Sequence, residues 1–312
     1  MLTNKQIIDA IKANPRIPVP SQTVCKILSL TRSQDCEIGK VAGLVGTDAG
    51  LTAQLLREVN SAAHAARVAI SSPLQACSRL GVKRIRSAVI NQHVVSGLGK
   101  CCPKGFDANR HYQSALATSV AAQDLCKTIL PDRAEDAGTS GLLCDIGIGL
   151  MAYGIQAEYK AVLDEAARPG ASELHRVEQR VLGLTHGDAG AAVLSDWGLD
   201  ASIVEAVKHH HREVKEAEIL KLPVFPRIIA AASTVSHLAL DGSDMELVDR
   251  LFAQVGAVTQ TADQVVGRVL DVLVANIQES AQTFAIEIGS TENLEANLAD
   301  LMKSLDAVAA KA

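Results

Sequence analysis

Aromatic residues are scarce in this sequence, at 3% of 312 residues, whereas hydrophobic residues of all kinds make 48%. Aliphatic side chains and alanine must therefore build the core. A β-sandwich normally shows Val, Ile, Thr, Tyr and Phe in alternation with polar residues, and no segment shows this pattern convincingly. The composition therefore predicts an all-α fold of closely packed helices.

Long hydrophobic runs and paired cysteine motifs are also missing. No apolar run approaches the roughly 20 residues that a membrane-spanning helix needs, and residues 1–14 lack a signal-peptide core. The seven cysteines are odd in number, irregularly spaced and without a CxxC pair, which argues against a disulfide framework and a structural zinc site. We expect a cytoplasmic protein with no membrane segment.

An excess of basic residues is absent too, because the formal net charge is −5. A nucleic-acid-binding protein usually carries a basic footprint, so nucleic acid is not an expected partner. Lys83, Arg84 and Arg86 do lie close together after Gly81. The simplest interpretation is a solvated helix face, and the alternative is a patch for an anionic ligand or partner.

Helical spacing of apolar residues runs along most of the chain. Asp48 can cap a helix that carries Leu51 and Leu55, and Gly81 and Gly183 are expected to end helices. Helices are expected near residues 6–11, 24–28, 49–59, 73–80, 85–90, 112–129, 142–153, 174–181, 186–194, 201–211, 228–238, 247–255, 265–277 and 294–308.

A loop is predicted over residues 100–109, where Cys101, Cys102, Pro103 and Gly105 interrupt the helical pattern. It would separate an N-terminal helical lobe, residues 1–105, from a helical core, residues 106–240. Residues 241–312 form a C-terminal helical extension in this interpretation. We expect no redox role for the two adjacent cysteines.

The last segment has an apolar stripe with spacings of four, three, four and three, which is a short heptad seam. Its residues are Leu294, Leu298, Leu301, Leu305 and Val308. A seam of about two heptads is a weak basis for self-association, so we expect a monomer; a coiled-coil dimer is the alternative. The stripe is expected to dock within the chain on the preceding helix, against Val265, Val269, Leu273 and Ile277.

Polar groups with possible chemistry occur inside apolar segments. Cys144 and Asp145 stand side by side in the stretch Leu142–Gly147, which fits a metal site, a hydrogen-bonded core carboxylate or a relic of a metal site. In the helix after Asp200, a rotation of about 100° per residue puts His210 and His211 on the apolar side. His64, His93 and His111 are expected to be ordinary surface or core residues.

Taken in order, several short motifs resemble the HDOD family, a catalytically degenerate branch of the HD-domain metal-dependent phosphohydrolases. The motifs are Ile17–Pro20, Asp48–Leu56 with Asn60–Ala62, Ile70–Ala76 ending at Leu80–Gly81, Leu142–Gly147, Thr185–Gly190 before Trp197, and His210–His211. The resemblance covers roughly residues 17–240 and implies an HD-like helical core.

The resemblance also implies where a metal site would have been, because active relatives hold one or two metal ions with His and Asp side chains. The corresponding positions are Gln113, Cys144, Asp145, His186, His210, His211 and Ser233. Active relatives have His, His and Asp where this chain has Gln113, Cys144 and Ser233. We therefore expect no metal and no cofactor, with Asp145 and the inward histidines as a hydrogen-bonded core network. A zinc site that includes Cys144 and a pocket for a small anion are the alternatives.

In function, the resemblance implies a non-enzymatic bacterial signal-transduction module that acts through protein–protein contacts. Such modules often stand beside receiver, diguanylate cyclase or phosphodiesterase domains, so a protein partner would supply input and output here. The alternative is a residual metal-dependent phosphohydrolase that acts on a nucleotide or a cyclic dinucleotide. The sequence does not identify the partner.

Overall fold

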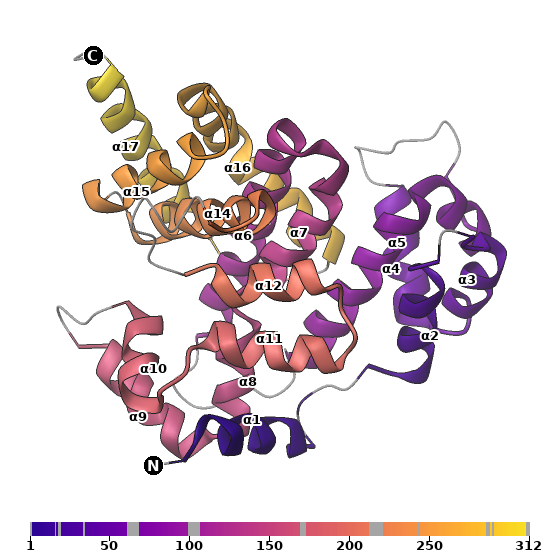
Figure 1. Ribbon diagram of the computed structural model, residues 1–312. Helices are drawn as coiled ribbons and strands as arrows, with labels where there is room; N and C mark the ends of the chain where they lie inside the picture. Colours follow the sequence, from indigo (N-terminus) through magenta and orange to yellow (C-terminus); the bar gives the residue numbers. More distant parts are fainter. Residues whose placement is uncertain are drawn as a thin grey trace. The chain divides into compact units, whose positions relative to one another are not determined.

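The computed structural model describes residues 2–15, 17, 20–33, 35–60, 69–98, 107–168, 173–211, 221–242, 244–284, 288 and 290–309 (Figure 1). Within these ranges the regular elements are helices and no strand occurs, so the predicted all-α fold is confirmed. None of the helices in the described residues is both long enough and apolar enough to cross a membrane.

The helices follow one another along the chain. They are α1 (Asn4–Ala13), α2 (Gln22–Leu30), α3 (Ile38–Val45), α4 (Ala49–Val59), α5 (Pro73–Leu98), α6 (Ala108–Ile129), the 3₁₀ turn η2 (Pro131–Arg133), α7 (Ala134–Leu143), α8 (Ile146–Gly154), α9 (Gln156–Ala166), α10 (Leu174–Leu182), α11 (His186–Asp196), α12 (Ala201–His209), α14 (Val224–Asp241), α15 (Met245–Gly256), α16 (Ala262–Phe284) and α17 (Glu292–Ala309).

The chain divides into two compact units. One comprises Met1–Ile17, Cys101–Gln278 and Glu287–Ala312, and the other comprises Pro18–Lys100 and Glu279–Ile286. The smaller unit is built from α2 to α5 with the end of α16, and the larger unit contains the remaining helices.

In the smaller unit, α4 packs against α5. The Asp48 carboxylate accepts a hydrogen bond from the Leu51 N–H at 2.9 Å, as the predicted cap requires. Gly81 interrupts α5 with a φ of 79°, which is the left-handed region that favours glycine. Beyond it, Lys83 is exposed, whereas Arg84 is half-buried and donates to Glu58 on α4.

In the larger unit, α6 packs against both α7 and α14. The contact with α7 is unusually close at Gly141, where an added Cβ would lie 2.6 Å from the Thr118 carbonyl oxygen. Glycine at this position therefore lets the two helix backbones meet. The close contact fixes the end of α7, which leads directly into the Cys144–Asp145 pair.

The stretch Leu142–Gly147 differs from the prediction. A single helix through Tyr153 was expected, but α7 ends at Leu143 and α8 begins at Ile146. At the junction the Asp145 backbone has φ −93° and ψ 8°, outside the α-helical region. The break turns neighbouring side chains in different directions: the Cys144 thiol donates back to the Ser140 carbonyl oxygen, while Asp145 faces three histidines.

At the C-terminus, α17 packs against α14, a partner that the sequence did not predict. Leu294, Leu298 and Leu301 are buried, and the Asn297 side chain donates to the Ala239 carbonyl oxygen at 3.0 Å. Ala239 lies in the last turn of α14, where carbonyl groups have no partner within the helix, and Asn297 satisfies one of them. The side chains of Leu305 and Val308 lie outside the described residues.

Candidate functional site

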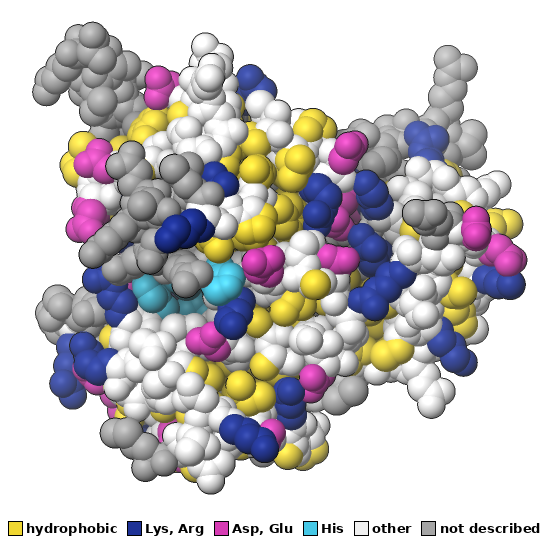
Figure 2. Space-filling view, viewed as in Figure 1, with side chains coloured by type: hydrophobic (Ala, Val, Ile, Leu, Met, Phe, Trp, Pro, Cys, Tyr) yellow, Lys and Arg dark blue, Asp and Glu magenta, His cyan; other side chains and the backbone are white. Residues whose placement is uncertain are grey.

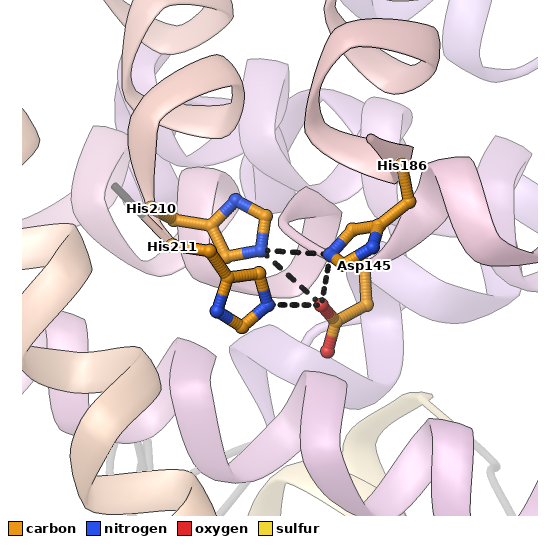
Figure 3. Close-up of side chains that lie close together, drawn as sticks. All are labelled: Asp145, His186, His210 and His211. Carbon is orange, nitrogen blue, oxygen red and sulfur yellow. Dashed lines mark hydrogen bonds and ion pairs between the residues drawn. The ribbon is translucent and has the colours of Figure 1, made fainter. Parts of the chain in front are cut away.

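Four side chains converge in the larger unit (Figure 3). They are Asp145 from the α7–α8 junction, His186 at the start of α11, and His210 and His211 after α12, and their ligand atoms all lie within 4.8 Å of one another. The His186 Nε2 atom is 3.3 Å from His210 Nε2 and 3.5 Å from Asp145 Oδ1. Asp145 Oδ1 is also 3.3 Å from His210 Nε2 and 3.9 Å from His211 Nε2.

Neighbouring groups hold two of the rings with Nε2 toward this cluster. The Nδ1 atom of His186 lies 2.7 Å from a Glu178 carboxylate oxygen, and the Nδ1 atom of His210 lies 2.6 Å from the Val207 carbonyl oxygen. Because these oxygens only accept hydrogen bonds, each Nδ1 must carry a proton. The Ser114 hydroxyl donates to the other oxygen of Asp145 at 3.0 Å.

Burial and charge oppose each other at the cluster. Burial raises the pKa of the Asp145 carboxyl, but hydrogen bonds and charge from His186 and His210 outweigh it and hold that pKa well below its usual range. Burial lowers the pKa of His186, but Glu178 and Asp145 outweigh it and raise the pKa to about 10. Without a metal ion, His186 is therefore a buried cation between two carboxylates.

A cavity of about 760 Å³ opens beside the cluster. Figure 2 shows histidine side chains in a recess of the face viewed, with charged side chains at its edge. His111 on α6, His175 on α10 and His237 on α14 line the cavity together with His186 and His211. The rings of His175 and His237 each lie parallel to that of His211, with centroids 4.6 and 5.3 Å away.

These additional histidines are uncharged at neutral pH. Burial lowers the pKa of His111 and of His237, and it lowers the pKa of His175 to about 4. The pKa of His211 lies well below its usual range, because burial and then the neighbouring His210 and His186 disfavour its charged form. Neutral imidazole is the form that binds metal ions.

Acidic side chains outnumber arginines in the cavity lining. The lining has six carboxylates, from Asp107, Asp145, Glu173, Asp241, Asp244 and Glu246, and three guanidinium groups, from Arg110, Arg176 and Arg250. Each arginine already faces a carboxylate: Arg110 faces Asp241, and Arg176 and Arg250 face Glu173. The cavity therefore favours a cation over a free anion.

The donor set fits a divalent transition-metal ion. Zinc binds imidazole nitrogen and carboxylate oxygen at about 2.0–2.2 Å in tetrahedral sites, which places neighbouring ligand atoms about 3.3–3.5 Å apart. Three of the measured separations, between His186, His210 and Asp145, lie at 3.3 to 3.5 Å. Asp145, His186 and His210 thus have the spacing of a zinc site without Cys144, and His211 Nε2, which lies 3.9 Å from Asp145 Oδ1, would have to move closer to bind the same ion.

Two predicted site positions lie elsewhere. Gln113 shares α6 with His111, but its amide donates to the Ile288 carbonyl oxygen, and Ser233 is buried in α14 outside the cavity lining. His111 and His237 line the cavity on these two helices instead. The ordinary role expected for His111 and the expectation of no metal both stay predictions.

The sequence interpretation missed Glu178, His175 and His237. The spacing of three residues between His111 and Ser114 on α6 is helical, so this face of the helix could have been searched. His64, Cys101 and Cys102 lie outside the described residues, as does the side chain of His93.

Comparison with known proteins agrees with the helical fold. A solved HDOD domain protein of unknown function from Geobacter sulfurreducens has a TM-score of 0.70 at 17% identity, covering 89% of this chain and 98% of its own. A candidate phosphohydrolase from Shewanella amazonensis SB2B also has a TM-score of 0.70, at 19% identity, with coverage of 89% and 97%. A candidate signal transduction protein from Marinobacter aquaeolei VT8 has a TM-score of 0.62 at 18% identity, with coverage of 90% and 65%.

These identities show a shared fold and do not transfer an activity. No curated protein sequence matches the chain significantly. The family model of the HDOD domain matches residues 17–213, which is more than half of the sequence. The chain therefore belongs to the HDOD domain family.

Proposed function

We propose that this protein is a regulatory signal-transduction module that acts through contacts with a protein partner and does not hydrolyse phosphoesters. Its histidine–aspartate cluster holds a divalent transition-metal ion, for which zinc is the best fit. The ion joins α8, α11 and the end of α12, so that occupancy of the site stabilises the arrangement of these helices that a partner would recognise.

The observation that carries this proposal is the number of protein ligand atoms in the cluster. Structural zinc sites use four protein ligands, whereas catalytic zinc sites use three and keep a position open for water. Asp145, His186, His210 and His211 supply four, within 4.8 Å of one another. A bound ion would be a Lewis acid, but four bound side chains would leave no position for an attacking water.

The charges of the cavity support the same conclusion. A phosphoester substrate is an anion, and it would meet six carboxylates and three arginines that already face carboxylates. A hydrolase would gain from free basic groups that neutralise a developing phosphoryl charge. Among the described residues of the lining, every arginine side chain already faces a carboxylate.

A metal-dependent phosphohydrolase acting on a nucleotide or cyclic dinucleotide is the second candidate. The observation in its favour is the cavity of about 760 Å³ beside the cluster, which lies in the size range of small-molecule sites. His211 lies farther from Asp145 than His210 does, at 3.9 against 3.3 Å. If His211 left the ion, a water could take its place.

Activity of the metal-loaded protein distinguishes the two candidates. Purified protein is loaded separately with Zn²⁺, Mn²⁺ and Co²⁺ and assayed with a chromogenic phosphodiester, a nucleotide and a cyclic dinucleotide. The matched control is Asp145→Ala, which removes one ligand. The proposal expects no turnover above the control. Turnover in the wild type that is lost in Asp145→Ala would establish the hydrolase.

A further inference from the structure

A fully buried carboxylate stands behind one ligand of the cluster. Glu178 on α10 has no exposed surface, although an isolated buried carboxylate is strongly disfavoured. It receives three hydrogen bonds: the Tyr159 hydroxyl donates to Oε1 at 2.6 Å, and the His186 backbone N–H and ring Nδ1 approach Oε2 at 2.8 and 2.7 Å. Two of these three bonds go to a single residue.

Contact at two points fixes His186 more firmly than a single hydrogen bond would. His186 is the first residue of α11, where backbone N–H groups lack partners within the helix. Glu178 binds one such N–H and the ring together, so that both the backbone position and the ring rotation are set. The backbone is also confined by Gly147, because an added Cβ there would lie 1.9 Å from the His186 carbonyl oxygen.

The same contact decides which ring nitrogen is available to the cluster. Since a carboxylate oxygen cannot donate, the hydrogen bond to Glu178 keeps a proton on Nδ1 of His186. The opposite nitrogen, Nε2, is the one that faces His210 and Asp145. A carboxylate that accepts the Nδ1 proton also makes the imidazole more basic at Nε2, so that Nε2 binds a metal ion more strongly.

Tyr159 on α9 determines how Glu178 itself is oriented. Its hydroxyl holds Oε1, which leaves Oε2 directed at His186. Tyr159 is fully buried, and Glu178 is its hydrogen-bond partner. We propose that Tyr159 and Glu178 are positioning residues that hold His186 with a proton on Nδ1 and Nε2 toward the cluster, so that metal affinity depends on them although neither reaches the metal.

This inference rests on the metal-binding part of the proposed function, and its test measures zinc affinity by competition with a chromogenic chelator. Glu178→Gln keeps the side-chain shape and removes the charge, so we expect zinc affinity to fall about 10- to 100-fold. Tyr159→Phe should give a smaller loss, because Glu178 keeps its two bonds to His186. The matched control is Glu165→Gln, whose carboxylate pairs with Arg180 at the surface.

Thermal melts of each variant separate a folding defect from a binding defect, and Tyr159→Phe provides a second variant if Glu178→Gln folds poorly. Zinc affinity in folded Glu178→Gln that equals that of the wild type and of Glu165→Gln would overturn the inference and leave the metal site standing. A wild-type protein that takes up no zinc would instead overturn the metal-binding part of the proposed function.

If the wild type takes up no zinc, the nitrogen NMR shifts of the His186 ring in the metal-free protein still test whether Tyr159 and Glu178 hold a proton on Nδ1. A hydrogen-bonded proton on Nδ1 is the expected result and supports the positioning role. An Nδ1 without a proton contradicts it, whatever the protein does with metals.

Discussion

The Nε2 atoms of His186 and His210 face each other across 3.3 Å in the buried cluster. The Nδ1 atoms of both rings are occupied by acceptors, so two unprotonated Nε2 lone pairs would repel each other at this distance. A proton or a metal ion between the rings removes the repulsion. This pair of nitrogens is therefore the feature that a bound cation would satisfy.

The close approach of α8 and α11 predicts that Gly147→Ala is severely destabilising. Its Cβ would lie 1.9 Å from the His186 carbonyl oxygen, so a backbone must move and the cluster must open. Gly267→Ala is the matched control on α16, where nothing lies within 4 Å of the new Cβ. Alanine should stabilise that helix by up to about 1 kcal/mol. Chemical denaturation of both variants measures the difference, and equal effects would contradict the close contact.

Removal of the cluster carboxylate tests its structural role. Asp145→Ala leaves the Ser114 hydroxyl and the facing histidines without their acceptor, so we expect a loss of about 1–3 kcal/mol in the free energy of unfolding. Asp164→Ala on the exposed face of α9 should change little. A thermal melt of Asp145→Ala that matches the wild type would count against a structural role for Asp145.

Thiol reactivity should separate the described cysteines by burial and pKa. Cys25 is exposed, whereas Cys77, Cys126 and Cys144 are buried. Burial raises the pKa of Cys77 to about 11 and of Cys126 to about 12, so very little of either thiol is in the reactive thiolate form at pH 8. Peptide mapping after alkylation at pH 8 should find Cys25 modified first. Rapid labelling of Cys77 or Cys126 in the folded protein would show that the account of this part of the fold is wrong.

The C-terminal helix should be needed for solubility. Truncation after Gly289 removes α17 and uncovers the apolar surface of α14 that Leu294, Leu298 and Leu301 bury. We expect the truncated protein to aggregate and the intact protein to remain a monomer in light scattering. A dimer of the intact chain together with a well-behaved monomer of the truncation would show that α17 is an oligomerisation element.

Local signals in the sequence were sufficient to predict much of the helical pattern. Asp48 as a cap, Gly81 as a break and Asp200 as a cap each depend on hydrogen bonds or backbone angles within a few residues, and each is found in the structure. The interruption at Cys144 and Asp145 was missed because both flanking segments are apolar. The docking of α17 on α14 was missed because the partner depends on which carbonyl groups the tertiary fold leaves open.

The candidate site could be predicted only in part, for a similar reason. Asp145, His186, His210 and His211 belong to recognisable motifs, and the structure brings them together. Gln113 and Ser233 were placed by the resemblance to the family's metal-ligand pattern, whereas His111 and His237 are the residues of these two helices that line the cavity. Glu178 belongs to none of these motifs. It lies eight residues before His186 in the sequence and reaches the site only through its hydrogen bond to the His186 ring.

The coordination of Co²⁺ in the loaded protein shows most directly whether four protein side chains close the metal site, as we propose. Visible absorption spectroscopy distinguishes the two outcomes, because tetrahedral cobalt absorbs far more strongly than cobalt with additional water ligands. We expect one equivalent of intensely coloured, four-coordinate cobalt that is lost in Asp145→Ala. Weakly absorbing cobalt with bound water, or a protein that takes up no cobalt, would contradict it.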